Sequence, residues 1–204
     1  ADWFDGISDP ERTRGVLERL RNTLGEIPLL FTFRTSGEGG EKEIDVPAYV
    51  SLNESAARSG MADLVDVEAF TESGAAEKII EEAHSAGVRV IASNHDFYKT
   101  PSREEIISRL VKMQDMGADI AKIAVMPQSR KDVLTLLAAT EEMVSGHAQI
   151  PVITMSMGAL GAISRVCGEV FGSAVTFGAV GRGSAPGQLG AGELGTVLSI
   201  LHNR

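Results

Sequence analysis

The residue that most clearly calls for a chemical explanation is Lys122, which lies in the run GADIAKIAVMP from Gly117 to Pro127. The rest of this run is typical of a buried strand in a parallel sheet, because strands covered on both faces are almost continuously apolar. A charged ammonium group is costly to bury unless it is paired or loses its proton. Desolvation lowers the pKa of a lysine, and the neutral amine can attack a carbonyl carbon to form a Schiff base. The run therefore suits a nucleophilic lysine, and it suits equally a structural lysine in a barrel interior that pairs with a carboxylate.

Other candidate side chains follow apolar runs at the points where those runs end. In barrel enzymes, the catalytic groups lie at the carboxyl ends of the strands and in the loops that follow, so such groups would share one mouth. Taken singly, His95 is more often a structural histidine, and Glu38 in a Gly-rich turn is more often a surface residue. The residues at these positions are Arg34, Glu38, Asn94, His95, Asp96, Met155, Met157, Ser184 and Gln188. The two methionines are more often packing residues, although they would also form an apolar wall that keeps Lys122 neutral.

These residues need elements that position them, and the chain alternates strand and helix patterns throughout. Asp9 is a predicted N-cap with Pro10 at the first helical position, and Gly25 is the predicted end of that helix. Ser129 with Asp132 indicates a capping box at the start of a later helix. The expected strands are 27–34, 64–70, 88–93, 117–127, 151–157 and 174–180, and the expected helices include 46–60, 75–87, 163–171 and a last one through Leu194 and Leu201. This alternation predicts an α/β fold with a parallel sheet.

Two parallel-sheet architectures compete. A doubly wound sheet would want a Gly-rich phosphate loop after its first strand, and TSGEGGE is neither GxGxxG nor a P-loop. A (β/α) barrel has eight strands, and only six are expected from this sequence. The positions of the polar residues favour the barrel. The Gly-rich segment 178–195, which contains SAPGQ, is either an ordinary flexible connection or a lid that closes over a ligand.

Composition excludes several classes of function. The 204 residues are 43% hydrophobic, which suits one domain with one sizeable core. A formal net charge of -9 argues against binding to nucleic acid and against a polybasic membrane patch. The single cysteine, Cys167, excludes a disulfide framework and a cysteine-based metal site, and it fits a reducing cytoplasm. No run approaches the length of a membrane span, and no signal-peptide pattern opens the chain.

Five segments in the same order resemble the motifs of type I 3-dehydroquinate dehydratase, the Schiff-base-forming enzyme of the shikimate pathway. These segments are FTFR with EGGE (31–34 and 38–41), SNHDF (93–97), GADIAKIAVMPQS (117–129), PVITMSMG (151–158) and SAPGQ (184–188). DVLTLL and GEVFGSA are similar to the enterobacterial form. The resemblance implies a (β/α)8 TIM barrel and a lyase that converts 3-dehydroquinate to 3-dehydroshikimate. It also implies a cytoplasmic homodimer that needs no metal or organic cofactor, because the lysine itself supplies the electrophile.

The resemblance further implies a role for each matching residue. Lys122 matches the lysine that condenses with the C3 ketone to give an iminium. His95 matches the general base that removes the C2 proton and returns a proton to the leaving C1 hydroxyl, and Glu38 matches the carboxylate that orients this histidine. Arg165 matches the arginine that holds the substrate carboxylate. Further substrate contacts and apolar walls are implied for Arg34, Ser184, Gln188, Met155, Met157 and Phe177.

The chain departs from the family pattern at its beginning. Family members carry two further strands before the segment that resembles DWFDGI, one of which ends in a Glu-x-Arg motif that reaches the substrate. We therefore expect residues 1–204 to be a single barrel domain that is N-terminally truncated, with about six of the eight strands, and to be a fragment with weak or no activity alone. The alternatives are a class I aldolase-type barrel, for which Arg182 offers little of a phosphate site, and a silent sugar-acid binder. Keeping Lys122, His95 and Glu38 together argues against the binder.

Overall fold

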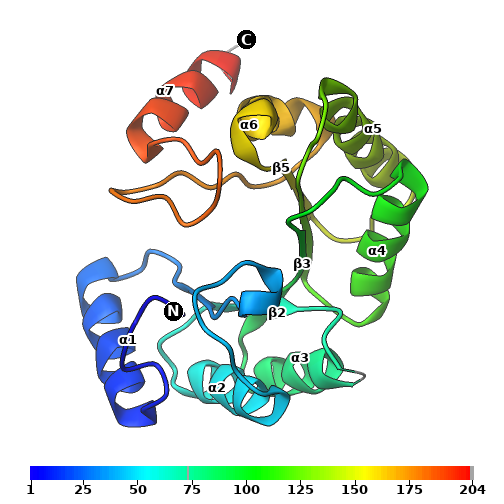
Figure 1. Cartoon of the computed structure of the whole chain (residues 1–204). Coiled ribbons are helices and arrows are strands. Elements are labelled where there is room, and N and C mark those ends of the chain that lie inside the picture. Colours follow the sequence, from blue (N-terminus) through cyan, green and yellow to red (C-terminus); the bar gives the residue numbers. More distant parts are fainter. Residues whose placement is uncertain (73, 203–204) are drawn as a thin grey trace. The chain divides into compact units, whose positions relative to one another are not determined.

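The computed structural model of the chain describes residues 1–72 and 74–202, which fall into two compact units. The first unit holds residues 1–94 and 115–120, and the second holds residues 95–114 and 121–204. Figure 1 follows the chain from its N-terminus to its C-terminus and shows strands and helices in alternation. Among the described residues, no helix is both long enough and apolar enough to cross a membrane.

The first unit is built on parallel strand pairs. Strand β1 (Leu30–Thr32) pairs with β2 (Leu64–Glu68), and β2 pairs with β3 (Arg89–Asp96), which continues into the second unit. The helices α1 (Pro10–Leu24), α2 (Val46–Arg58) and α3 (Ala75–Ser85) accompany these strands, and a short 3-10 turn, η1 (Ser36–Glu38), follows β1. Their shared core is apolar and includes Phe31, Val65, Val67, Ile79 and Val90.

Local signals explain where the helices of this unit begin and end. The Asp9 carboxylate accepts hydrogen bonds from the backbone N–H groups of Glu11 and Arg12, and Pro10 occupies the first turn of α1. Gly25 ends that helix with a φ of 59°, a conformation that favours glycine. The predicted cap and stop of this helix are therefore both confirmed.

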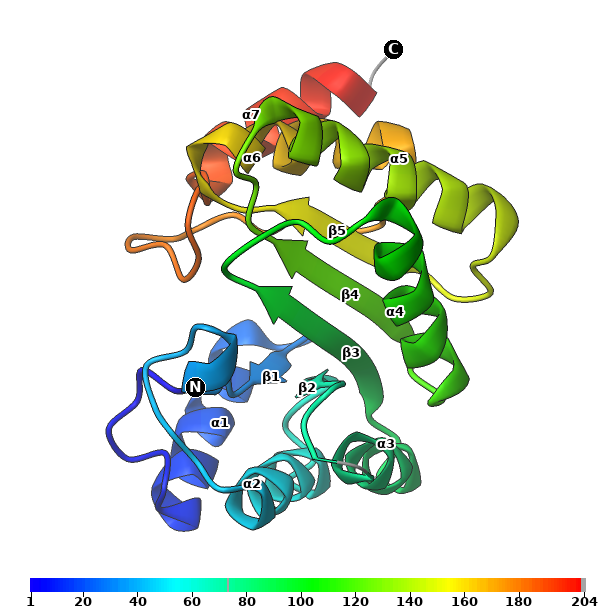
Figure 2. The ribbon, with the colours of Figure 1, turned by 45° about the vertical axis from the view of Figure 1, so that its right-hand side comes forward.

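The second unit contains the parallel pair of β4 (Ile120–Val125), all but its first residue, and β5 (Val152–Ser156), in which Lys122 lies opposite Ile153. Its helices are α4 (Arg103–Asp115), α5 (Arg130–Gly146), α6 (Gly158–Cys167) and α7 (Ala191–His202), with a 3-10 segment η2 (Gly168–Phe171) after α6. The capping box of Ser129 and Asp132 is present at the start of α5. Figure 2 shows α5 and α6 on the same side of β5, against which both helices pack.

A buried polar contact joins α5 to β5. The hydroxyl oxygens of Thr140 and Thr154 are 2.6 Å apart, and both side chains are buried. The Thr140 hydroxyl also contacts the carbonyl of Leu136 at 2.8 Å. Buried hydroxyls are costly unless they are hydrogen-bonded, so this pair ties the helix to the strand at one position.

The expected strand 174–180 is wrong, and the structure has five strands among its described residues. The Ala174 N–H donates to the Val152 carbonyl as a ladder would require, but the Thr154 N–H donates to the side-chain hydroxyl of Ser173. A side chain thus takes the place of the backbone carbonyl, and the ladder ends after one bond. Further along, Ala179 forms an isolated bridge with Gly190 instead.

Other elements also differ from the expected bounds, most of them by one to three residues at an end. The strand expected at 27–34 is only Leu30–Thr32. Strand β3 is longer than expected and includes Asn94, His95 and Asp96, so these side chains lie on the strand itself. The helix expected at 163–171 begins at Gly158 and changes to a 3-10 helix after Cys167.

Gly161 in α6 leaves no room for a side chain. A Cβ atom there would lie 2.2 Å from the backbone oxygen of Ser156, so Gly161→Ala is expected to destabilise the fold by about 1–3 kcal/mol through overpacking. The matched control is Gly195→Ala in α7, where no atom lies within 4 Å of the added Cβ, and which is expected to stabilise by about 0.5–1 kcal/mol. Urea denaturation measures both changes. Equal effects of the two substitutions would contradict the close approach of α6 to β5.

Candidate active site

The densest group of charged side chains in the first unit surrounds Arg34. Its Nη1 atom donates to Glu38 Oε2 at 3.3 Å and to Glu68 Oε1 at 3.2 Å, and its Nη2 atom is paired with Asp66 Oδ1. The Ser93 hydroxyl donates to Asp66 at 2.7 Å. Three carboxylates thus converge on the guanidinium of Arg34, which follows β1. Glu38 comes from η1, and Asp66 and Glu68 come from alternate positions on β2.

Burial and like charges act together on Glu38. Burial, together with the nearby Glu68 carboxylate, raises the pKa of this carboxyl to about 8, although the Arg34 guanidinium and the hydrogen bond from Asn94 act in the opposite direction. The Asn94 Nδ2 donates to Glu38 Oε1 at 3.0 Å. Burial lowers the pKa of Arg34, but Asp66, Glu38 and Glu68 outweigh it, so the pKa lies above its ordinary value and the guanidinium stays charged.

The raised pKa of Glu38 makes stability depend on pH in a defined window. Between about 4.5, the ordinary value, and about 8, the folded state binds more protons at Glu38 than the unfolded state does, so stability falls as pH rises through this window. From about pH 5 to about pH 8, the wild-type chain is expected to lose on the order of a few kcal/mol more stability than Glu38→Gln. Urea denaturation at the two pH values measures the difference. The exposed Glu26→Gln is the control and should follow the wild type; a Glu38→Gln curve parallel to wild type would refute the prediction.

In the second unit, Lys122 lies in the middle of β4 and is 7% exposed. Its Nζ atom is 5.0 Å from the centroid of the Phe177 ring. The methionines expected as apolar walls are also buried, Met155 within β5 and Met157 directly after it. The lysine is thus buried within its strand, as the apolar run predicted.

His95 is half-buried near the end of β3. Its ring stacks on Phe97 with a centroid distance of 6.5 Å and an interplanar angle of 28°. An aromatic contact of this kind restrains the orientation of the imidazole.

Arg165 is carried by α6 and is almost completely buried. Its Nη2 atom donates to the carbonyl of Pro186 at 3.2 Å, and its Nη1 atom contacts the sulfur of Met155 at 3.5 Å. In the part of the chain that the structure describes, its Nε atom has no hydrogen-bond partner. Burial lowers the pKa of this arginine, and the arrangement leaves donor capacity that an anionic ligand could use.

The loop with Ser184 and Gln188 is held to the start of α6. The backbone N–H of Gly158 donates to the carbonyl of Pro186 at 3.1 Å, so this carbonyl accepts from both Gly158 and Arg165. Within the loop, the N–H and hydroxyl of Ser184 both donate to Gln188 Oε1, at 2.7 and 3.2 Å. The two side chains expected to contact a substrate therefore satisfy each other here.

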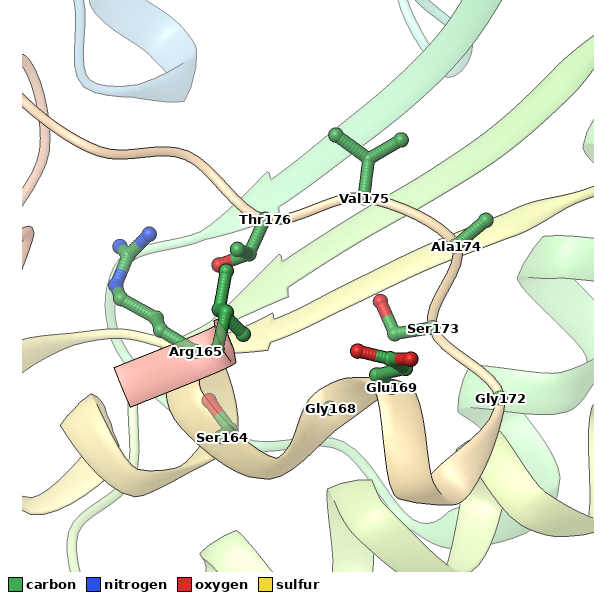
Figure 3. A pocket seen from close by; sticks show the side chains of 10 residues that line it. Ser164, Arg165, Gly168, Glu169, Gly172, Ser173, Ala174, Val175 and Thr176 are labelled. Atoms are coloured by element: carbon green, nitrogen blue, oxygen red, sulfur yellow. The ribbon is translucent and has the colours of Figure 1, made fainter. Parts of the chain in front are cut away.

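A cavity of about 350 Å³ lies behind these residues, between α6, η2 and the segment 172–176. Figure 3 shows the guanidinium of Arg165 pointing away from the Glu169 carboxylate on the cavity wall. The hydroxyls of Ser164 and Ser173 on the same wall are hydrogen-bonded to the backbone. Arg165 thus lines the cavity without reaching the Glu169 carboxylate.

The predicted site residues divide between the two units. The first unit brings Arg34 and Glu38 together. The second unit brings Lys122 near Phe177, Arg165 against Met155, and Ser184 onto Gln188. His95 lies on β3 and Met157 is the N-cap residue of α6, and their predicted roles stay predictions.

Asp66 and Glu68 were missed by the sequence reasoning, although a signal for them exists. Both lie in LVDVE, the strand β2, and are almost completely buried. The rule that singled out Lys122, a charged side chain inside a buried strand, applies to these two carboxylates as well.

Comparison with known proteins gives matches along the whole chain. The family profile described as Type I 3-dehydroquinase matches residues 1–204. The chain is 54% identical to a 3-dehydroquinate dehydratase of Klebsiella pneumoniae, over 98% of the chain and 80% of that protein. It is 52% identical to a 3-dehydroquinate dehydratase of Bacillus licheniformis, over 99% of the chain and 80% of that protein.

Solved structures give the same result for the fold. The chain is similar to the crystal structure of a type I 3-dehydroquinate dehydratase from Clostridium difficile that carries covalently modified comenic acid. The TM-score is 0.96 at 51% identity, covering 99% of this chain and 80% of that one. A 3-dehydroquinate dehydratase from Geobacillus kaustophilus gives a TM-score of 0.96 at 44% identity, covering 100% of this chain and 79% of that one. These matches confirm the predicted α/β class with parallel strands and its similarity to barrel structures of this type.

Proposed function

The chain belongs to the type I 3-dehydroquinase family, and its reaction is the dehydration of 3-dehydroquinate in the shikimate pathway; from this premise we propose that Lys122, His95 and Glu38 carry the chemistry. The observation that carries the proposal is the burial of Lys122 on β4, because burial favours the neutral amine that must attack a ketone.

The proposed reaction runs through a lysine imine. The neutral Nζ of Lys122 adds to the C3 carbonyl carbon, and loss of water gives an iminium that acts as an electron sink. His95 takes the C2 proton, which the iminium has made acidic, and the electron pair of that C–H bond moves into the sink. The C1 hydroxyl then leaves as water with a proton returned by His95, and hydrolysis of the imine frees the product and Lys122. Glu38 is the carboxylate that orients His95.

The proposed substrate contacts are likewise those that the family resemblance implies. Arg165 binds the substrate carboxylate, which suits its buried guanidinium and the Nε atom that lacks a hydrogen-bond partner among the described residues. Arg34, Ser184 and Gln188 supply further polar contacts, and Met155, Met157 and Phe177 supply apolar walls. The pairing of Ser184 with Gln188 then has to be exchanged for contacts with the substrate.

Mass spectrometry tests the role of Lys122 directly. The chain is incubated with 3-dehydroquinate and borohydride, and its intact mass and its peptides are then measured. A reduced adduct on the peptide that holds Lys122 is the expected result. A folded chain that binds the substrate and gives no adduct, or an adduct on another lysine, would overturn the proposal. Binding without an adduct would favour the silent sugar-acid binder, whereas the family match disfavours a class I aldolase.

We also propose that the protein is a cytoplasmic homodimer. The family resemblance supports the dimer, and the single cysteine supports a reducing compartment. Light scattering coupled to size-exclusion chromatography tests the dimer, and a monomer at micromolar concentration would contradict it.

A further inference from the structure

The loop that holds Ser184 and Gln188 contains a tight turn that presents a carbonyl to its surroundings. The N–H of Gln188 donates to the carbonyl of Ala185 at 3.3 Å, and the residues between them are Pro186 and Gly187. Gly187 has a φ of 74°, and proline at the second position with a positive-φ glycine at the third is typical of a type II turn. The hydrogen bond that closes the turn does not use the central carbonyl, that of Pro186. This oxygen can therefore accept hydrogen bonds from outside the turn.

Two donors on α6 share the Pro186 oxygen. The N–H of Gly158, the first residue of the helix, donates to it at 3.1 Å, and Arg165 Nη2 donates to it at 3.2 Å. The first N–H groups of a helix have no acceptor within the helix, and the N-cap residue Met157 forms no side-chain cap. The turn therefore caps α6 at its N-terminus and also holds a guanidinium further along the same helix.

The turn reaches α6 only because position 187 has no side chain. A Cβ atom on Gly187 would lie 2.3 Å from the backbone oxygen of Gly158 and 2.7 Å from its carbonyl carbon. Both are backbone atoms, so neither can move aside as the end of a flexible side chain would. Gly181 lies in the same loop with a φ of 76°, but a Cβ atom there would meet no described atom within 4 Å, its chain neighbours aside. The two glycines therefore share a left-handed backbone and differ in the contact.

Arg165 depends on the Pro186 carbonyl for its orientation. Arg165 is 2% exposed, and in the part of the chain that the structure describes, this carbonyl is the only oxygen that accepts from its guanidinium. Burial lowers the pKa of Arg165, and no acidic side chain of the described residues acts against this effect. Figure 3 shows the guanidinium turned away from the Glu169 carboxylate. Because a guanidinium is planar and holds its N–H groups in a fixed fork, a bond to one nitrogen restrains the directions of the others.

We propose that Pro186 and Gly187 are positioning residues for the dehydration: Gly187 lets the turn dock on α6, and the Pro186 carbonyl holds the Arg165 guanidinium ready for the substrate carboxylate. This role rests on the proposed function, in which Arg165 binds that carboxylate. A guanidinium has several N–H donors, so the bond to Pro186 leaves others for a ligand. Docking of the turn and binding of the carboxylate therefore favour each other, and because such coupling is reciprocal, each changes the other by the same factor.

NMR of the ligand-free chain tests the docking contact. The signals followed are the backbone N–H of Gly158 and the Nε–H of Arg165, the latter assigned by its loss in Arg165→Met. In Gly187→Ala, both protons are expected to exchange with water at least about tenfold faster, because the turn no longer reaches either residue. Gly181→Ala is the matched control and should exchange like the wild type, since it places alanine in the same backbone conformation without the collision. Equal effects of the two substitutions, or faster exchange at Gly158 with none at Arg165, would overturn the inference.

Steady-state kinetics test the consequence for substrate binding. Gly187→Ala is expected to raise KM for 3-dehydroquinate by about tenfold, with a smaller fall in kcat, because a hydrogen bond to a charged group is worth about that factor. In an Arg165→Met background the same substitution should raise KM further by less than about threefold, since no guanidinium is left to position. An undiminished rise in that background would show that the turn acts through Ser184 and Gln188 alone, and it would overturn the positioning role.

The wild-type chain decides the question should Gly187→Ala fail to fold. An equilibrated mixture of 3-dehydroquinate and its product, both of which carry the carboxylate, should slow exchange of the Gly158 N–H, whereas the methyl ester of 3-dehydroquinate should not. Equal effects of the acid and the ester would contradict the coupling. Because the ligand-free exchange needs no substrate and the lysine adduct needs no exchange measurement, failure of this inference and failure of the proposed function are distinguishable.

Discussion

Replacing Lys122 by methionine is expected to reduce kcat by at least about 10⁴-fold, because the covalent path and its electron sink are lost together. Methionine has a similar unbranched length, so the buried position on β4 stays filled. Stability should therefore be unchanged or slightly higher, since removal of a buried amine lifts a desolvation cost. Steady-state kinetics, borohydride labelling and urea denaturation of one preparation measure all three effects.

The control for this substitution is Lys131→Met on the exposed side of α5, which removes the same charge without touching a buried strand. It should keep wild-type kinetics and the adduct. A Lys122→Met chain that keeps more than about one hundredth of the wild-type kcat would show that the dehydration does not pass through this amine.

Replacing Arg34 by methionine is expected to have the largest effect on stability. The change leaves Asp66, Glu68 and Glu38 buried without their shared guanidinium, and breaking a buried ion pair by removing one partner costs about 3–5 kcal/mol. The loss should be full at about pH 8 and should shrink as pH falls, because carboxyls that become protonated no longer need the positive charge. Urea midpoints and slopes at about pH 5 and about pH 8 measure this dependence.

Arg58→Met provides the comparison on the surface. Arg58 pairs with Glu82 across exposed helix faces, and such pairs contribute about 0–1 kcal/mol. Its substitution should cost little at either pH. A loss below about 1 kcal/mol for Arg34→Met at both pH values would mean that the three carboxyls relax into water once the arginine is gone.

Helix boundaries could be predicted where one or two neighbouring residues decide them. Asp9 with Pro10, Gly25, and Ser129 with Asp132 act through bonds to the backbone within a few residues, and each is found as expected. The strand that holds Lys122 could also be predicted, because a run of apolar residues indicates a buried strand. The candidate residues at strand ends were found from the ends of such runs, and their roles came from the family resemblance.

Features that depend on contacts far along the chain could not be predicted in this way. The segment 174–180 has the composition of a strand, but its pairing is interrupted by the Ser173 hydroxyl that accepts from the Thr154 N–H. The apolar pattern of the segment does not indicate that the Ser173 hydroxyl, and not a backbone carbonyl, will accept the hydrogen bond from Thr154. The charge balance around Arg34 was hidden likewise, because Asp66 and Glu68 lie more than thirty positions away from it in the chain.

The hydrogen-bonded hydroxyls of Thr140 and Thr154 fix the position of α5 along β5. Apolar contacts tolerate a small slide of a helix along a strand, since one methyl group serves nearly as well as the next. The pair of buried hydroxyls does not, because a slide by one residue would leave the Thr154 hydroxyl without its partner on α5, at a cost of about 1–3 kcal/mol, whereas Thr140 would keep its bond to Leu136. This hydrogen bond therefore sets the position of β5 along its axis relative to α5, and with it the position of the carboxyl end of the strand. Met155 follows Thr154 and points to the opposite face of the strand, so the contact of Thr154 with α5 also fixes the position of Met155.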